Sequence, residues 1–315
     1  MKARALSWNH GGDSMYNEVH RWMVRNARAV ELALWRCYFE NGDPRNVADA
    51  LLAYQNEDGG FGHALEPDCW NPGSTPITTW TALKYMLSVG FTDMTHPAYQ
   101  GVWRYLASGK DLEDYGWRFT VPQNDAYPRA PWWSYDEKSN QSNYPNVTVG
   151  LTAFILKYGE DAELIAAAKG YAGQLAALLV ERASFGEALE GYDFLLEAME
   201  ANGMPVQAET WAILRQKQNA SIGRDPAQWK NYVPRPSRFI HNVNSPLYIG
   251  NESIVQAEVE YLKGTRQPGG VWPITWTWFD MMERYGREFA ISENWWKGLV
   301  AIENMLFLKA FDKGE

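Results

Sequence analysis

The sequence predicts an all-α fold of paired helices, and three observations lead to that prediction. Apolar residues recur every three or four positions through most of the chain. Glycine, proline and Asn-Gly signals end these segments and leave short links between them. Alternation with a period of two is absent over useful lengths, so we expect few strands.

The predicted helices can be placed one after another along the chain. The first covers residues 16–42, and the second, residues 43–60, begins with Asp43 as N-cap and Pro44 in its first turn. A further helix is possible between residues 219 and 245. The other predicted helices cover residues 74–90, 96–110, 146–159, 161–183, 186–203, 205–218, 251–264, 275–286 and 292–311.

Length and composition indicate a soluble protein. The 315 residues suit one large domain, predicted to span 1–315 with a long aromatic loop at about 118–145. A net charge of −9 argues against a nucleic-acid partner, which needs a basic surface. No segment approaches the ~18 uninterrupted apolar residues of a membrane span. The N-terminus lacks an apolar leader and the two cysteines form no disulfide framework, so we expect a cytoplasmic protein. Nothing in the sequence indicates an oligomeric state.

Two short segments repeat the same pattern after a helix. Residues 54–62, YQNEDGGFG, and residues 265–272, TRQPGGVW, share a glutamine, a short turn and a glycine before an aromatic residue. A third, weaker copy lies at residues 103–117. Glutamine can bond free backbone groups at a helix end, and glycine permits a positive φ. We therefore interpret eight residues as scaffold: Gln55, Gly59, Gly60, Phe61, Gln267, Gly269, Gly270 and Trp272.

This pattern resembles the QW repeat of terpenoid cyclases and related repeats of protein prenyltransferase β-subunits. The resemblance implies an α/α toroid, a barrel of about six helical hairpins in which inner helices surround a central cavity and outer helices cover them. The chain also resembles a group of bacterial proteins with an AYQNEDGGFG-ALEPD signature, and that resemblance implies no activity.

The catalytic motifs of the resembled families are missing. The chain has neither the Asp-x-Asp-Asp run of proton-initiated cyclases nor the Asp-Asp-x-x-Asp run that binds diphosphate through magnesium. The prenyltransferase zinc set of Asp, Cys and a distant His would fall on Asp68, Cys69 and His241, with a spacing that departs from the family pattern. We therefore predict no metal and no cofactor.

The strongest candidate residues follow the first glycine turn. His63, Glu66 and Asp68 lie in a loop that, in a toroid, would enter an inner helix at the mouth of the cavity. Carboxylates near a helix N-terminus transfer protons, bind cations or cap backbone amides. We expect Glu66 and Asp68 to be catalytic and His63 to bind substrate, and the alternative is a loop-bracing role.

Three further groups complete the candidate substrate site. Trp132, Trp133 and Asp136 form a possible platform in the long loop, with a lid as the alternative. His241 and Glu252 flank the entry to a later helix. Trp272, Trp276 and Asp280 fall four apart, on one face if their helix starts early, with Asp280 as a third catalytic carboxylate and ordinary core packing as the alternative.

Two enzymatic interpretations and one non-enzymatic interpretation remain open. The 16 tryptophans could stabilise a carbocation, which together with the repeats favours a terpenoid-cyclase-like enzyme acting on an isoprenoid-type substrate. Indoles also stack on sugars, and the asparagine-rich loops favour an oligosaccharide ligand and a glycoside hydrolase or lyase. The third interpretation is a toroid that binds a small molecule without catalysis.

Overall fold

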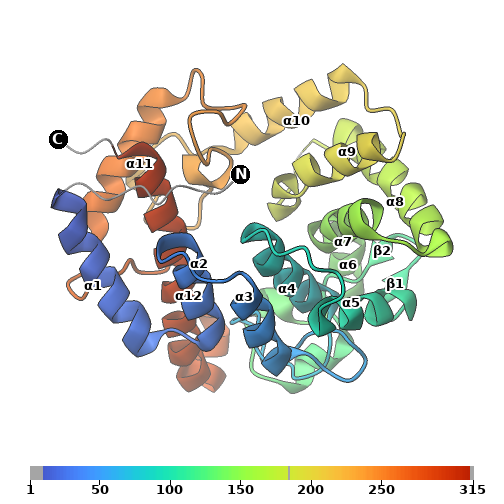
Figure 1. The fold of residues 1–315 in the computed structure, drawn as a ribbon, viewed down its shortest axis with the longest axis horizontal. Coiled ribbons are helices and arrows are strands. Elements are labelled where there is room, and N and C mark those ends of the chain that lie inside the picture. The colour runs from blue at the N-terminus through green and yellow to red at the C-terminus, as the bar shows by residue number, and fades with distance from the viewer. Residues whose placement is uncertain (1–9, 184, 313–315) are drawn as a thin grey trace. The chain divides into compact units, whose positions relative to one another are not determined.

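The computed structural model describes residues 10–183 and 185–312 and is mostly helical, which confirms the all-α prediction (Figure 1). In the described part the only strands are β1 (Leu112–Glu113) and β2 (Gly116–Trp117), an antiparallel pair with Leu112 opposite Trp117. The α-helices are α1 (His10–Asn26), α2 (Ala29–Phe39), α3 (Arg45–Leu51), α4 (Pro76–Ser88), α5 (Pro97–Ala107), α6 (Glu137–Asn143), α7 (Pro145–Tyr158), α8 (Ala162–Glu181), α9 (Tyr192–Ala201), α10 (Ala208–Ser221), α11 (Glu252–Thr265) and α12 (Met282–Phe311). The 3-10 helices are η1 (Leu52–Tyr54), η2 (Pro122–Ala126), η3 (Pro131–Trp133), η4 (Glu187–Glu190), η5 (Pro226–Gln228), η6 (Pro236–Arg238) and η7 (Phe279–Met281).

Polar caps mark several helix starts. The Thr75 hydroxyl accepts a hydrogen bond from the Thr78 amide at 3.1 Å before α4. The His96 ring accepts one from Ala98 before α5, and the Asp161 carboxylate accepts two before α8. Each cap satisfies amides that have no partner inside the helix, so these starts follow from the local sequence.

The first predicted helix is in fact two helices, α1 and α2. Arg28 between them has an extended backbone, with φ −68° and ψ 164°. The Glu31 carboxylate accepts the Arg28 amide at 3.1 Å and also pairs with the Arg28 guanidinium, and Glu31 is fully buried. This capping pair begins a new helix, although neither glycine nor proline lies at the break between α1 and α2.

The prediction of a helix at residues 275–286 is wrong over its first half. The chain is irregular up to Trp278, passes through η7, and enters α12 only at Met282. Trp272 and Trp278 are both almost fully buried, so tertiary packing of these indoles overrides the helical pattern. Between residues 219 and 245 the structure has only η5 and η6 beyond the end of α10, not a further α-helix.

The chain divides into two compact units, and each is described by itself. Unit 1 comprises Met1–Ala53, Tyr85–Phe91 and Ser221–Glu315, and unit 2 comprises Tyr54–Lys84 and Thr92–Ala220. In unit 2, α7 is buried from Pro145 to Leu156 and packs on α8 and α9. In unit 1, α12 packs on α1, α2 and α11. A single toroid domain over 1–315 stays a prediction.

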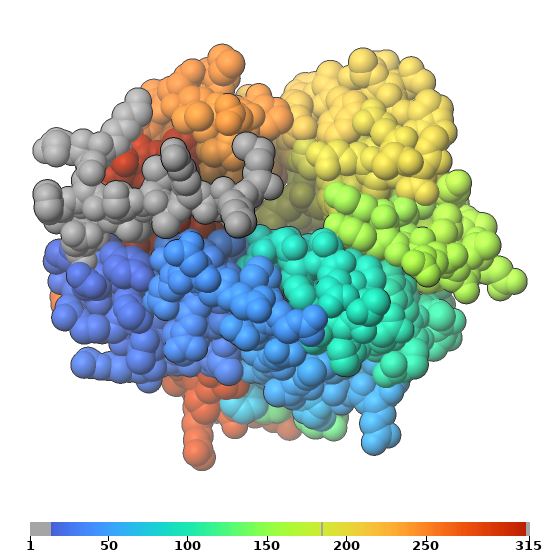
Figure 2. Space-filling view, in the orientation of Figure 1, coloured from blue at the N-terminus to red at the C-terminus, as the bar shows by residue number. Residues whose placement is uncertain are grey.

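Helix α8 has an unusual composition for a partly exposed helix. By length and apolar content it is the one candidate for a membrane span among the described residues. Only 22% of the apolar window is buried, and the lime-green surface in Figure 2 includes this part of the chain. The predicted absence of a membrane span therefore stays a prediction.

Candidate functional site

The first glycine turn is a rigid corner. The Gln55 side-chain amide donates to the carbonyl oxygens of Gly59, at 2.9 Å, and of Ala98 at the start of α5, at 2.8 Å. Gly59 has φ +90°, and a Cβ at this position would overlap the carbonyl oxygen of Gly101 in α5. Phe61 is fully buried. These contacts support the scaffold interpretation of this corner.

The second glycine turn has the same backbone hydrogen bonds in a shifted register. The Asn56 amide donates to Gly60, and the Gln267 amide correspondingly donates to Val271. Gly270 therefore corresponds to Gly59, and Trp272 corresponds to Phe61. Matching the two segments by their glutamines is wrong by one residue, because Gln267 occupies the place of Asn56.

Trp272 has a scaffold role in this second turn. It is 2% exposed, and its indole N–H donates to the Leu262 carbonyl at 2.8 Å. The indole nitrogen, the one polar atom of the Trp272 side chain, already donates to α11. No contact therefore supports a substrate-binding role for Trp272.

A shared contact supports the third copy of the turn. The Phe61 amide donates to the Thr79 hydroxyl on α4 at 3.1 Å. The Trp117 amide donates in the same way to the Thr148 hydroxyl on α7 at 3.0 Å. In both copies the amide of the aromatic residue after the glycine is fixed to a threonine hydroxyl on a later helix, α4 in the first copy and α7 in the third.

Glu66 and Asp68 lie buried in the loop that follows the first turn. Their exposed fractions are 7% and 1%. One Glu66 carboxyl oxygen accepts the Asp68 amide at 3.2 Å. Burial first, and then the negative charge of Asp68, raises the pKa of Glu66 to about 8. Glu66 therefore holds a proton at neutral pH.

The long aromatic loop holds this acidic loop in place. The Ala130 amide donates to the Asp68 carbonyl, and the Trp70 amide donates to the Pro128 carbonyl. Burial raises the pKa of the neighbouring Cys69 thiol to about 12, so Cys69 is a neutral thiol and a poor metal ligand. Across the described ranges, no group of three or more His, Cys, Asp or Glu residues could hold a metal ion.

A pocket of about 450 Å³ opens beside this loop in unit 2. His63 lies on its wall, whereas Glu66 and Asp68 are not among the lining residues, and the substrate-binding role of His63 stays a prediction. The lining residues are Asn56, His63, Asn71, Pro72, Gly73, Gln123, Ala126 and Tyr127.

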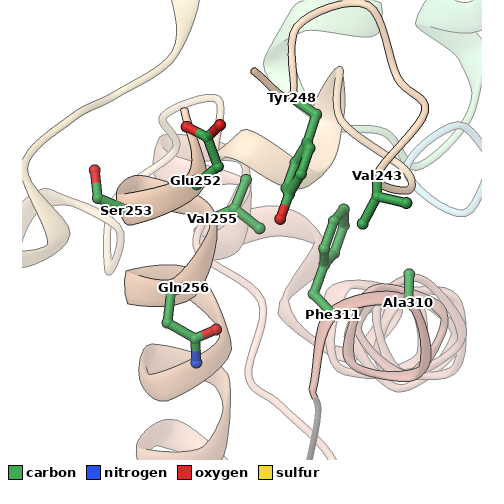
Figure 3. A pocket seen from close by; sticks show the side chains of 8 residues that line it. All are labelled: Val243, Tyr248, Glu252, Ser253, Val255, Gln256, Ala310 and Phe311. Carbon is green, nitrogen blue, oxygen red and sulfur yellow. The ribbon is translucent and has the colours of Figure 1, made fainter. Parts of the chain in front are cut away.

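A second pocket, of about 320 Å³, lies in unit 1 and includes Glu252 (Figure 3). Glu252, Ser253 and Gln256 project from α11 on one side, and Tyr248 and Phe311 form the other side. The Tyr248 and Phe311 rings stack with centroids 5.5 Å apart. The Glu252 carboxylate accepts the Gly250 amide at 2.8 Å, which ties the first residue of α11 to the preceding turn.

The predicted platform in the long loop is mostly structural. Trp133 is 6% exposed and packs against Phe119, and its carbonyl accepts the Asn124 side-chain amide at 3.0 Å. Trp132 beside it is half-buried. Asp136 caps α6 by accepting the Ser139 amide. Trp133 and Asp136 therefore brace the loop, and the substrate-binding role of Trp132 stays a prediction.

The remaining candidates lie in unit 1. His241 is exposed, and its backbone amide donates to the Ser245 hydroxyl. Trp276 is half-buried and meets Trp296 edge to face at 5.1 Å. Asp280 is exposed in η7. Since α12 starts after them, Trp272, Trp276 and Asp280 do not share a helical face, and the expectation of one indole row beside a carboxylate is wrong.

Sequence reasoning missed the amides that line the pocket of unit 2. Asn56, Asn71 and Gln123 sit in turns where asparagine and glutamine are common, so composition alone gives no signal. It also missed Glu258, a fully buried acid of unit 1 that accepts from the Ser237 hydroxyl and amide and pairs with Arg235. Its position on the buried face of α11 was the available signal.

Comparison with known proteins gives no match to this chain among family models, curated proteins or solved structures.

Proposed function

We propose that this chain is an enzyme that protonates an isoprenoid-type substrate from the Glu66 side chain. The observation that carries the proposal is a carboxyl group that is buried beside Asp68 and has a pKa of about 8. General acid catalysis works best when the pKa of the acid lies near the working pH. The pKa of Glu66 meets that condition, and the negative charge of Asp68 helps to raise this pKa.

The raised pKa favours an oxygen as the atom that receives the proton. An acid with a high pKa is a weak acid, which disfavours direct protonation of a carbon–carbon double bond. Protonation of an allylic alcohol or epoxide oxygen is easier, because proton transfer accompanies cleavage of the C–O bond. For an alcohol, the Glu66 proton and the hydroxyl leave as water and the carbon becomes a cation. The Glu66 carboxylate then takes a proton from an adjacent carbon, which forms an alkene and restores the acid.

The repeated turns support the α/α toroid that this proposal assumes. In the first turn Gly59 lies against Gly101 of α5, the helix after the one that follows the turn. In the second turn Gly270 lies against Glu18 of α1, since a Cβ on Gly270 would be 2.8 Å from the Glu18 carbonyl oxygen. In each turn the glycine thus lies against a helix other than the one that follows the turn, which is a shared feature of the two copies.

The placement of the two carboxylates distinguishes the two enzymatic interpretations. Glycoside hydrolases place two carboxylates on opposite sides of the scissile bond. Glu66 and Asp68 instead belong to one turn, in which the Asp68 backbone amide donates to the Glu66 carboxyl group. That arrangement favours a single proton donor. The carbohydrate interpretation is supported by a different observation, the uncharged polar lining of the neighbouring pocket.

Turnover of prenyl alcohols and epoxides, with oligosaccharides as the competing class, tests the proposal. We expect Glu66→Gln to lower kcat by about 10²-fold or more, the usual contribution of a general acid. Asp280→Asn, an exposed carboxylate in the loop after the second turn, is the matched control and should retain activity. Full activity in folded Glu66→Gln would overturn the proposal, and turnover of oligosaccharides alone would transfer it to the carbohydrate class.

The pH profile of the same reaction tests the role of Asp68. Activity should fall on the alkaline side as Glu66 loses its proton near pH 8. Asp68→Asn removes the charge that raises the pKa of Glu66, so this limb should move to lower pH. An unchanged limb would show that Asp68 does not act on the acid.

A further inference from the structure

The side chain of His63 is held in a defined orientation at the pocket of unit 2. His63 and Ala64 both have φ +56°, in the left-handed region that residues other than glycine seldom occupy. The His63 amide donates to the Asn71 carbonyl at 3.0 Å. Consecutive left-handed residues of this kind persist only where the surrounding contacts enforce them, and they are common at binding sites.

The Asn56 side chain determines which nitrogen of His63 carries the proton. The Asn56 amide nitrogen donates to the Pro72 carbonyl oxygen at 3.0 Å. A carbonyl only accepts, so the nitrogen and oxygen of Asn56 cannot be exchanged. The Asn56 oxygen therefore faces His63 Nε2, at 2.9 Å, and Nε2 must donate.

A chain of polar contacts keeps Asn56 in this orientation. The Ser74 hydroxyl donates to the Asp58 carboxylate, so it accepts the second hydrogen of the Asn56 amide at 3.0 Å. The other Asp58 oxygen pairs with the Lys110 ammonium at 2.8 Å. The Asp58 carboxylate can only accept, so Ser74 must donate to it and accept from Asn56. This fixes which atom is the donor in each hydrogen bond from Asp58 to the His63 ring.

The neutral His63 ring is thus left with Nδ1 as an unprotonated acceptor. Within residues 10–183 and 185–312, Nδ1 has no hydrogen-bonding partner, and the ring is exposed at the pocket wall. Gln123 and Tyr127 also line the pocket, and none of its described lining residues is Asp, Glu, Lys or Arg. Such a lining suits a neutral ligand with hydroxyl groups.

We propose that this pocket binds a ligand hydroxyl through His63 Nδ1, with Asn56 as the positioning residue. A hydroxyl of this kind is carried by a saccharide or by an isoprenoid alcohol, so both are used as probes. The inference concerns residues other than the Glu66 acid. Its failure is therefore distinguishable from failure of the proposed function.

Nitrogen-15 NMR of the wild-type protein tests the tautomer directly. Above the range in which histidine is protonated, His63 should show a protonated Nε2 and an unprotonated Nδ1. The exposed His241 in unit 1 is the internal comparison. A dominant Nδ1–H form, or an equal mixture, would overturn the proposal.

Titration with maltotriose and with farnesol tests the ligand. One of them should shift the Nδ1 resonance of His63 and leave that of His241 unchanged. His63→Gly removes the ring and tolerates the positive φ, and we expect it to weaken binding at least tenfold. Asn56→Ala should mix the tautomers and weaken binding. If neither probe shifts Nδ1, or His63→Gly binds normally, the proposal is wrong.

Discussion

The two glycine turns share one backbone design and lead into different loops. Both have the same pair of backbone hydrogen bonds, a positive-φ glycine against a neighbouring helix, and a buried aromatic residue. After the first turn the chain buries Glu66 and Asp68, whereas after the second it buries Trp278 and leaves Asp280 exposed. The turn is therefore scaffold, and the loop after it determines what chemistry each copy can perform.

Glycine-to-alanine substitutions should give the largest difference in stability between the two turns. Gly59→Ala combines a positive φ with overlap of the Gly101 carbonyl, so we expect a loss of about 3 to 6 kcal/mol in the free energy of unfolding. Gly270→Ala meets a less severe clash with Glu18, and about 2 to 3 kcal/mol is expected. Denaturant unfolding measures both.

Gly90→Ala is the matched control for these two variants. Gly90 has φ +74° and no neighbouring atom within 4 Å of the position of a Cβ. Only the backbone strain remains, and the expected loss is about 1 kcal/mol. Equal losses in all three variants would show that strain, and not contact with the neighbouring helix, makes these glycines necessary.

The pH dependence of stability should reveal the acid that only the first loop contains. Glu66 has a higher pKa in the folded state than its ordinary 4.5, so the folded state retains a proton that the unfolded state loses. This contribution is fully present below pH 4.5 and is lost as the pH rises to about 8. At ~1.4 kcal/mol per pH unit, wild type should lose about 3 kcal/mol relative to Glu66→Gln between pH 5 and pH 8.

Parallel denaturation curves of the two proteins across this range measure the effect. A constant difference between wild type and Glu66→Gln would mean that Glu66 is ionised in the folded protein. In that case the proposed proton donor is lost, and the two loops no longer differ in the way described.

Substitution of the residue before each turn should give the smallest difference in stability between the two turns. Gln55 donates two hydrogen bonds to carbonyl groups, and Gln55→Ala should cost about 1 to 3 kcal/mol. Arg266 holds the equivalent position and makes a partly exposed ion pair with Glu18, so Arg266→Ala should cost less than about 1 kcal/mol. Similar losses in thermal unfolding would contradict this ranking.

Local signals predicted much of the secondary structure. Pro76, Pro97 and Asp161 lie at the starts of α4, α5 and α8, close to where the predicted helices 74–90, 96–110 and 161–183 begin, because caps and first-turn prolines act within a few residues. The break at Arg28 was missed although Arg28 and Glu31 are only three residues apart, because arginine is not one of the usual N-cap residues. The irregular chain before α12 was missed for a similar reason, the burial of Trp278.

The types of residue in the candidate site were easier to predict than their positions in space. The acidic loop after the first turn stood out by composition, and the burial that raises the pKa of Glu66 appears only in three dimensions. The role of Asn56 in orienting His63 depends on Pro72 and Ser74, well beyond the reach of a local motif. The four-residue spacing of Trp276 and Asp280 wrongly predicted a shared face, because that prediction assumes a helix at these positions.

The contact of Gly270 with α1 has a consequence for how the chain folds as it is synthesised. Arg266 and Glu18 are separated by 248 positions, so this corner cannot form until residue 266 has left the ribosome. The residues of unit 2 emerge earlier and need no such late partner. The faces of α1 and α2 that pack on α12 therefore stay uncovered until α12 has been synthesised, and such exposed surface favours aggregation during folding.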